Sequence, residues 1–274
     1  MPTSAEVREQ LTAPGGPFEV VTETVLGRRM GVYKERLRSL REVPALAQGR
    51  GDDRPHIVFG DRRVGFAEFV ATANSISRRL SGACGIGHGD RVAVLSANNP
   101  EWCLTFWGTV DLGAVLVGLN GWWKADEIVF GLRDSGARVL VADSARLARV
   151  ADRLSECPDL EAVFVVDPSE EVGPHLRPFA ELLTDPGPEP PSGQIDEDDP
   201  AVIFYTSGTT GRPKGAVSTH RSMIANLQNT FYNTVAGALA NPSADGPAGG
   251  DGQTVSLLTS PLFHVSGCHS GIVV

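Results

Sequence analysis

The segment YTSGTTGRPKGA, from Tyr205 to Ala216, concentrates residue types that could hold a polyphosphate. Glycines let the backbone approach a ligand closely and turn its N–H groups inward, which forms a concavity that binds anions. Lys214 adds a mobile positive charge, worth about 4 kcal/mol against a unit negative charge at about 4 Å and intermediate dielectric. The hydroxyl groups that could donate to phosphate oxygens belong to Thr206, Ser207, Thr209 and Thr210.

A second interpretation of this segment is a solvent-exposed turn, because Gly, Thr, Ser and Pro are ordinary loop residues. Composition alone favours the turn, whereas the order of the residues favours a phosphate site. The order does not match a Walker loop, in which lysine directly follows the second glycine. Here Gly208 and Gly211 are three residues apart, and Lys214 is followed by Gly215. The run GIGHGD at 85–90 also fails as a dinucleotide-binding motif G-x-G-x-x-G. It lacks the third glycine of that motif at the required position, and it precedes a predicted strand instead of following one.

The composition is that of a soluble globular protein, with 41% hydrophobic and 21% charged residues among 274. A formal net charge of −9 argues against a nucleic-acid-binding surface, which needs a basic footprint. The N-terminus carries charges and lacks an apolar signal core, and no apolar run approaches the roughly 20 residues that span a bilayer. We therefore expect a cytoplasmic protein with no transmembrane segment and no nucleic-acid partner.

The cysteines stand far apart in the sequence, with no CxxC pair, which favours reduced cytosolic thiols over a zinc site or a disulfide framework. His264 lies close to Cys268 and His269, but no further ligand is clustered there, so we predict no metal-binding side chains. The four cysteines are Cys84, Cys103, Cys157 and Cys268.

From Arg91 onward, short apolar runs alternate with amphipathic stretches, which predicts strands that alternate with helices. The first of these helices has clear boundaries, with Asn99 as its cap, Pro100 at its first position and Gly113 at its end. This order implies right-handed crossovers, so the predicted fold class is α/β, with mostly parallel sheets flanked by helices. The predicted strands are 91–96, 114–119, 138–143 and 161–166, and the predicted helices are 99–113, 124–136 and 144–156.

Elements outside this core are less regular. We expect a hairpin at 56–64 that turns at Gly60, a helix over 64–83 and another helix near 31–40. The segment 218–227 has the features of a helix start. Stretches rich in Pro and Gly predict linkers at 185–200 and 237–252, and TVSLLT predicts a strand at 254–259. Trp122, Trp123 and Phe130 are expected to be packing residues, with a contact to a substrate or partner as the alternative.

The segment YTSGTTGRPKGA closely resembles the signature phosphate-binding loop of the adenylate-forming superfamily, which includes acyl-CoA synthetases, aryl-CoA ligases, luciferases and peptide-synthetase adenylation domains. The runs GDRVAVLSANNPEWCLTFWGTVDLGAVLVGLN and EIVFGLRDSGARVLVAD are similar to the early part of acyl-CoA synthetases, so the resemblance spans about Val64 to Gly267. It implies that the residues contacting ATP are Thr206, Ser207, Gly208, Thr209, Thr210, Gly211 and Lys214.

The run SPLFHVSG, at 260–267, resembles the family motif that lines the acyl pocket, and the resemblance implies that His264 lies beside the substrate carboxylate. On its own, a histidine after an apolar run is more often structural, hydrogen-bonded at the end of a strand. His264 favours an acyl or aryl acid over an amino acid as substrate, because an aromatic residue there would have indicated an amino-acid adenylation domain.

The resemblance implies an acid–thiol ligase that uses ATP and Mg²⁺ to convert a carboxylic acid to an acyl-adenylate and then transfers the acyl group to coenzyme A. A fatty acid is the leading candidate for this substrate. The alternatives are an adenylation domain that loads a carrier protein and a non-catalytic remnant of such an enzyme. The expected partner is a small-molecule carboxylic acid, with a homodimer as the possible assembly.

Members of the superfamily are considerably longer, and their later motifs are missing from this sequence. These motifs read the adenine, supply a Mg²⁺-binding glutamate, hold the ribose and form the hinge and the mobile C-terminal domain with its adenylation lysine. We therefore expect an incomplete N-terminal domain of the adenylate-forming fold, with little adenylation activity alone. Residues 1–195 would form a first α/β subdomain and 196–274 the start of a second, which carries the phosphate loop, with the C-terminal domain absent.

Overall fold

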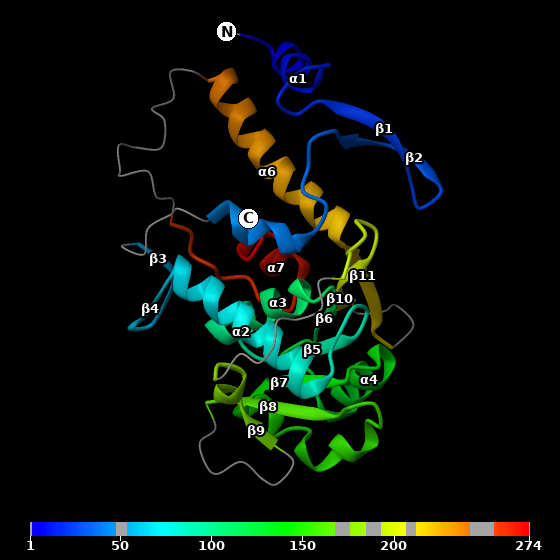
Figure 1. Cartoon of the computed structure of the whole chain (residues 1–274), viewed down its shortest axis with the longest axis vertical. Helices are drawn as coiled ribbons and strands as arrows, with labels where there is room; N and C mark the ends of the chain where they lie inside the picture. The colour runs from blue at the N-terminus through cyan, green and yellow to red at the C-terminus, as the bar shows by residue number, and fades with distance from the viewer. Residues whose placement is uncertain are drawn as a thin grey trace.

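A seven-stranded sheet forms the centre of the molecule, in the strand order β11-β10-β6-β5-β7-β8-β9 (Figure 1). The computed structural model describes residues 2–47, 54–167, 176–184, 193–206, 212–241 and 255–273. Neighbouring strands are parallel except β10 and β11, so the predicted α/β class with a mostly parallel sheet is confirmed. The strands are β5 (Arg91–Leu95), β6 (Val115–Gly118), β7 (Val139–Asp143), β8 (Ala162–Val166), β9 (Leu176–Pro178), β10 (Pro200–Thr206) and β11 (Lys214–Thr219).

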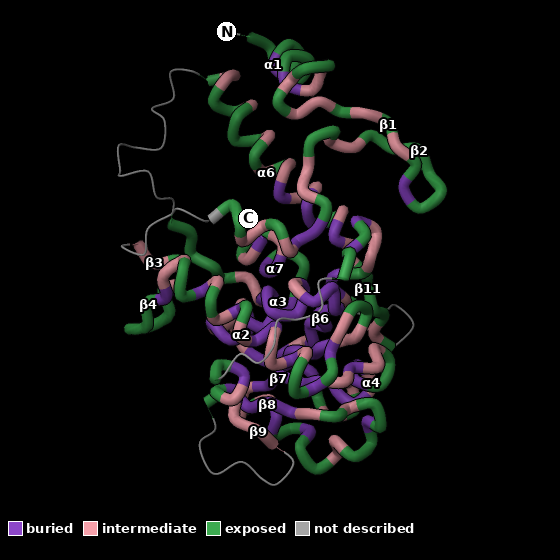
Figure 2. The backbone as a smooth tube through the Cα atoms, viewed as in Figure 1, coloured by how far each residue is buried: buried purple, intermediate pink, exposed green. Residues whose placement is uncertain are grey.

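Helices cover both faces of this sheet because alternate residues of its central strands are apolar on each side. Val92 and Val94 of β5 pack into the core with α2 (Phe66–Cys84) and α3 (Pro100–Asp111). Ala93 of the same strand packs into a second core with α4 (Ala125–Ser135) and α5 (Ser144–Leu147). Figure 2 shows the buried residues gathered on these strands and on the helix surfaces that face them.

The ends of these helices follow from their capping residues. Asn99 caps α3, with its side-chain oxygen 2.8 Å from the Trp102 N–H that donates to it, and Pro100 occupies the first turn as predicted. Helices α2 and α4 end at Gly85 and Gly136, both at a φ of +60°, a conformation that costs glycine little. The predictions for 64–83, 99–113 and 124–136 are confirmed to within a few residues.

The N-terminal part contains α1 (Ser4–Thr12), β1 (Val20–Val25), β2 (Arg28–Tyr33) and the 3₁₀ helix η1 (Leu40–Ala47). The helix predicted near 31–40 is therefore wrong. Leu26 and Gly27 both adopt positive φ angles, 47° and 79°, and this turn joins β1 and β2 in an antiparallel hairpin. The hairpin predicted at 56–64 is confirmed as β3 (Pro55–Phe59) and β4 (Arg62–Gly65).

Helix α6 (His220–Ala240) follows β11, and its first turn is capped by Thr219, which accepts a hydrogen bond from the Ser222 N–H at 3.2 Å. Figure 1 shows α6 running from the sheet toward α1, and Phe18 packs edge-on against Tyr232 with 5.6 Å between ring centroids. The helix start predicted at 218–227 is confirmed, but β11 stands between the glycine-rich segment and this helix and was not predicted.

Two further predictions need correction. The helix predicted over 144–156 is two short pieces, α5 and the 3₁₀ helix η2 (Ala151–Glu156), because Val150 leaves helical geometry at a φ of −135° and a ψ of −2°. No described strand pairs with 255–259, so the strand predicted at 254–259 is wrong for those residues. Val255 and Leu257 stand in solvent, 86% and 89% exposed. The remaining elements are η3 (Phe179–Leu182) and α7 (Val265–Gly271).

The predicted boundary between residues 195 and 196 lies just before β10, which pairs with β6 in the central sheet. The division into two subdomains stays a prediction. Among the helices that the structure describes, none combines the length and the apolar character needed to cross a bilayer.

Candidate active site at the carboxyl edge of the sheet

The order in which the chain adds strands to the sheet reverses between β5 and β7. Strand β5 leads through α3 to β6 on one side of β5, and β6 leads through α4 to β7 on the other side. In open α/β sheets, ligands bind beyond the carboxyl ends of the strands at such a reversal. We call the carboxyl ends of β5, β6, β7 and β10, with the loops that follow them, the carboxyl edge.

Both arms of the predicted phosphate loop reach this edge. Thr206 is the last residue of β10 and pairs with Lys214, the first residue of β11. The Thr206 hydroxyl lies 3.3 Å from the Lys214 carbonyl oxygen, to which it donates, and both residues are exposed. The other predicted ATP contacts, Ser207, Gly208, Thr209, Thr210 and Gly211, lie outside the described residues.

Gly118, at the end of β6, allows two other segments to approach closely. A Cβ atom on Gly118 would lie 2.7 Å from the Phe204 ring and 3.4 Å from the Cα atom of Phe263. Gly118 also pairs with Phe204 in the sheet, two residues before Thr206. We call β10 and β11, with the residues that connect them, the phosphate hairpin. The end of β6 is therefore where the phosphate hairpin and the segment SPLFHVSG meet.

Asn98, in the loop after β5, fixes the position of SPLFHVSG. Its side-chain N–H donates to the Ser260 carbonyl oxygen at 2.9 Å, and its side-chain oxygen accepts from the Leu262 N–H at 2.8 Å. Sequence reasoning did not identify Asn98 as a site residue, and the signal that was available is its place directly after a buried strand of the parallel sheet. Through Asn98 and Gly118, His264 comes to the same edge as Thr206 and Lys214.

His264 is exposed and is the N-cap of α7. The Ser266 N–H donates to its Nδ1 at 3.4 Å, and the Ser266 hydroxyl oxygen lies 3.1 Å from the same nitrogen. This is the structural role that a histidine after an apolar run commonly has. Within the part of the chain that the structure describes, no hydrogen bond involves Nε2, so this nitrogen can face a ligand while Nδ1 caps the helix.

Aromatic rings surround the docking point of Phe263. Trp122 packs edge-on against the Phe263 ring at 5.1 Å between centroids, but the residue is 69% exposed, so most of its surface is free for the contact with a substrate or partner that the sequence left open. Trp123 is buried and packs against Tyr205 at 5.3 Å, as expected of a packing residue. Trp122 and Phe263 therefore give the carboxyl edge an apolar wall beside His264.

Two cysteines near this edge are held in their thiol form by burial. Burial raises the pKa of Cys103 to about 12 and also raises the pKa of Cys268, so neither side chain supplies a thiolate at neutral pH. Burial lowers the pKa of His269, which favours the neutral ring. Within the described ranges, no three His, Cys, Asp or Glu residues are grouped so that they could hold a metal ion.

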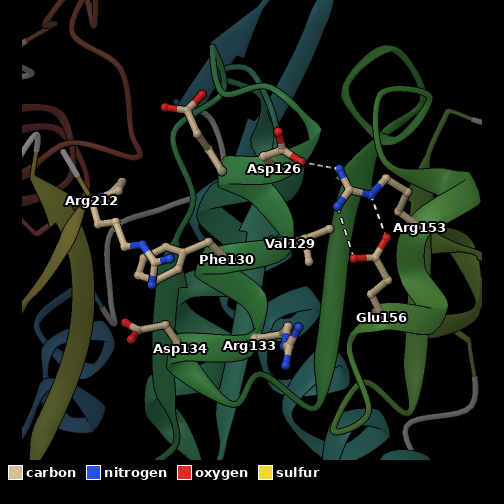
Figure 3. A pocket seen from close by; sticks show the side chains of 10 residues that line it. Asp126, Val129, Phe130, Arg133, Asp134, Arg153, Glu156 and Arg212 are labelled. Carbon is tan, nitrogen blue, oxygen red and sulfur yellow. Dashed lines mark hydrogen bonds and ion pairs between the residues drawn. The ribbon is translucent and has the colours of Figure 1, made fainter.

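A groove of about 710 Å³ lies beside the phosphate hairpin, between α4 and residues 212 and 213 (Figure 3). On the side toward η2, Arg153 is paired with Asp126 and Glu156, at 2.5 Å and 2.6 Å. On the side toward the hairpin, the Arg212 guanidinium lies over the Phe130 ring at 5.9 Å from its centroid. The opposing charges leave this groove without the net positive character that an anion site needs.

Comparison with known proteins identifies relatives of this chain. Residues 45–274 match the family described as AMP-binding enzyme. The chain is 38% identical over 163 residues to long-chain-fatty-acid–CoA ligase FadD13 of Mycobacterium tuberculosis, which covers 60% of this chain and 31% of that protein. It is 32% identical over 212 residues to 4-coumarate–CoA ligase 2 of Oryza sativa subsp. japonica, which covers 73% of this chain and 36% of the relative.

Among solved structures, the anthranilate CoA ligase AuaEII in complex with anthranoyl-AMP superposes with a TM-score of 0.65 and 26% identity. This match covers 73% of the present chain and 38% of that chain. The chain thus spans about a third of the length of these relatives.

Proposed function

This chain belongs to the AMP-binding enzyme family, and from this premise we propose that its carboxyl edge binds the phosphates of ATP and the carboxylate of an acid substrate. One observation carries the proposal: Gly118 and Asn98 bring both arms of the glycine–hydroxyl loop and His264 to one edge of the sheet. The complete activity we propose is that of an acid–thiol ligase that forms an acyl-adenylate.

In the proposed first step, an oxygen of the acid attacks the α-phosphorus of ATP. The bond from this phosphorus to the bridging oxygen of the β-phosphate breaks, and pyrophosphate leaves with the bonding electrons. Negative charge grows on the leaving group, so donors already in place there lower the barrier. We assign this role to the ammonium group of Lys214 and to the backbone and hydroxyls of 207–211. The Thr206 hydroxyl joins them when it turns from the Lys214 carbonyl oxygen to a phosphate oxygen.

In the second step, the sulfur of a thiol attacks the acyl carbonyl carbon, the bond to AMP breaks, and the thiol proton passes to solvent or a base. Coenzyme A is the proposed thiol, because the relatives that match are named CoA ligases. A carrier-protein thiol is the alternative acceptor.

The proposed substrate is a fatty acid, which is supported by the likeness to long-chain-fatty-acid–CoA ligase FadD13. An aromatic acid is a second candidate. It is favoured by the likeness to a 4-coumarate–CoA ligase and by the pair of Trp122 and Phe263, which presents aromatic surface beside His264. In both cases His264 would present Nε2 to the carboxylate.

Mg²⁺ is expected to reach this site with the nucleotide, because this ion usually binds phosphate oxygens and water with one or two carboxylates. The described residues at the carboxyl edge contain no grouped metal ligands, so they do not form a metal site of their own and we assign no step to the ion. The cytoplasmic location, the homodimer and the division at residue 196 also stay proposals.

The proposal is tested by the affinity of the chain for MgATP and Mg-pyrophosphate, measured by titration calorimetry. Lys214→Met should weaken both ligands about tenfold, or about 1.4 kcal/mol, because one positive charge is lost from an exposed phosphate site. Lys34→Met is the matched control, since Lys34 pairs with Glu19 in the N-terminal region. Absence of binding by the wild-type chain, or an equal loss in both variants, would contradict the proposal.

A further inference from the structure

Both arms of the phosphate hairpin contact one turn of helix α4. Before the loop, the Tyr205 hydroxyl donates to the Asp134 carboxylate at 2.8 Å and lies 3.3 Å from the Gly131 carbonyl oxygen. After the loop, Arg212 lies over the ring of Phe130. Phe130 and Asp134 are four residues apart, so they project from the same face of α4, and Figure 3 shows the Arg212 guanidinium at the Phe130 ring.

Tyr205 is held in one place by its surroundings. Its ring packs edge-on against Trp123 at 5.3 Å and against Phe130 at 6.3 Å. Burial, together with the hydrogen bond to Asp134, raises the pKa of Tyr205, so the hydroxyl keeps its proton and acts as a donor at all physiological pH values. The strand residue next to Thr206 is therefore anchored to a helix as well as to the sheet.

The ladder between β10 and β11 ends at the pair Thr206 and Lys214, which are the two described residues assigned to the phosphates. The pairing of β10 with β6 ends at Phe204, so beyond this residue the sheet restrains Thr206 only through its ladder with β11. A rotation of this end of the hairpin would shift both Thr206 and Lys214. Contacts to α4 from Tyr205 and Arg212 restrain the hairpin on the side of α4.

We propose that Phe130 and Asp134 of α4, with Tyr205 and Arg212 of the hairpin, form a clamp that sets the positions of Thr206 and Lys214. In this clamp, Tyr205 and Asp134 are positioning residues that act on ATP through Thr206 and Lys214. The inference rests on the proposed function for its ligand, and it adds Phe130 and Asp134, two residues of α4 outside the loop motif, to the residues that control affinity for phosphate.

The groove itself supplies a matched control. Arg153 lines the same groove as Arg212, but it pairs with Asp126 and Glu156 and its described contacts do not include the hairpin. Arg153→Met therefore removes the same charge from the same groove and leaves the clamp intact. A comparison with Arg212→Met separates the clamp from a general effect of charge.

The experiment measures dissociation constants of MgATP and Mg-pyrophosphate by calorimetry, together with the urea midpoint of each variant. Tyr205→Phe and Asp134→Ala should each raise both dissociation constants about three- to tenfold. The dissociation constants of the double variant should not exceed those of the single variant that binds less tightly. Asp134→Asn, which keeps an acceptor oxygen, should stay within about twofold of wild type. Arg212→Met should weaken binding, whereas Arg153→Met should not.

Additive effects of Tyr205→Phe and Asp134→Ala, or unchanged affinity in both, would overturn the clamp. So would an equal loss in Arg153→Met and Arg212→Met. A merely structural role would lower the urea midpoint in proportion to the loss of affinity, whereas the clamp predicts lost affinity at a nearly unchanged midpoint.

Failure of the proposed function is recognised separately. If the wild-type chain binds neither ligand, the nucleotide site fails, and the positioning role fails with it. The clamp as a restraint is then decided by amide hydrogen exchange at Thr206 and Lys214. Faster exchange at these amides in Tyr205→Phe, but not in Arg153→Met, supports the restraint, and equal exchange rates overturn it.

Discussion

Replacement of Asn98 by alanine tests how the acid-binding segment is held at the carboxyl edge. The substitution removes both hydrogen bonds between the loop after β5 and residues Ser260 and Leu262. Each intramolecular hydrogen bond contributes about 0.5–1.5 kcal/mol net, so the two together stabilise the docked segment by about 1–3 kcal/mol. This corresponds to a change of roughly 5- to 150-fold in the equilibrium constant between the docked and the undocked segment.

The assay combines urea unfolding with hydrogen exchange at the Leu262 amide. We expect Asn98→Ala to lower the unfolding free energy by about 1–3 kcal/mol and to speed exchange at Leu262. Asn229→Ala is the control, because the Asn229 side chain accepts a single hydrogen bond from the Tyr33 hydroxyl and this hydrogen bond is exposed to solvent. A loss in Asn98→Ala no larger than that in Asn229→Ala, with unchanged exchange at Leu262, would refute the docking role.

Two further predictions concern close packing and pH. Gly118→Ala should lower the unfolding free energy by about 1–3 kcal/mol in urea titrations, because the new Cβ would meet the Phe204 ring at 2.7 Å. Gly237→Ala, in α6 with open space around it, should instead be neutral or stabilising by up to about 1 kcal/mol. Burial lowers the pKa of His220 to about 4, from 6.5, so the folded state disfavours its protonation. The contribution of neutral His220 to the unfolding free energy is fully present above pH 6.5 and is lost as the pH falls toward 4. The loss amounts to about 3 kcal/mol, at about 1.4 kcal/mol per pH unit. The pH slope of unfolding should be shallower in His220→Asn, and an unchanged slope would contradict this assignment.

The central βα units could be predicted from the sequence because their signals are local. Asn99 and Pro100 mark the start of α3, and runs of Val and Leu identify strands that are buried on both faces. The assignment of the loop motif to phosphate stays a prediction, and the structure shows where its two described members, Thr206 and Lys214, lie in the sheet. Thr206 and Lys214 needed only the position of β10 to come to the carboxyl edge.

The remaining features depend on contacts that sequence patterns do not contain. The hairpin of β1 and β2 turns on Leu26 and Gly27, and an exposed Leu at positive φ gives no turn signal in a sequence. Asn98 and Gly118 matter only because SPLFHVSG returns to them from more than a hundred residues later. The contact of α4 with both arms of the phosphate hairpin was hidden for the same reason, since Phe130 and Asp134 look like ordinary helix residues.

A crystal structure of the chain with Mg-pyrophosphate would show whether the phosphate hairpin and His264 serve one nucleotide-dependent site. We expect phosphate oxygens within hydrogen-bond distance of the Thr206 hydroxyl and the Lys214 ammonium group, at the carboxyl edge that also holds His264. Pyrophosphate bound elsewhere, with Thr206 and Lys214 turned away from it, would contradict a shared site.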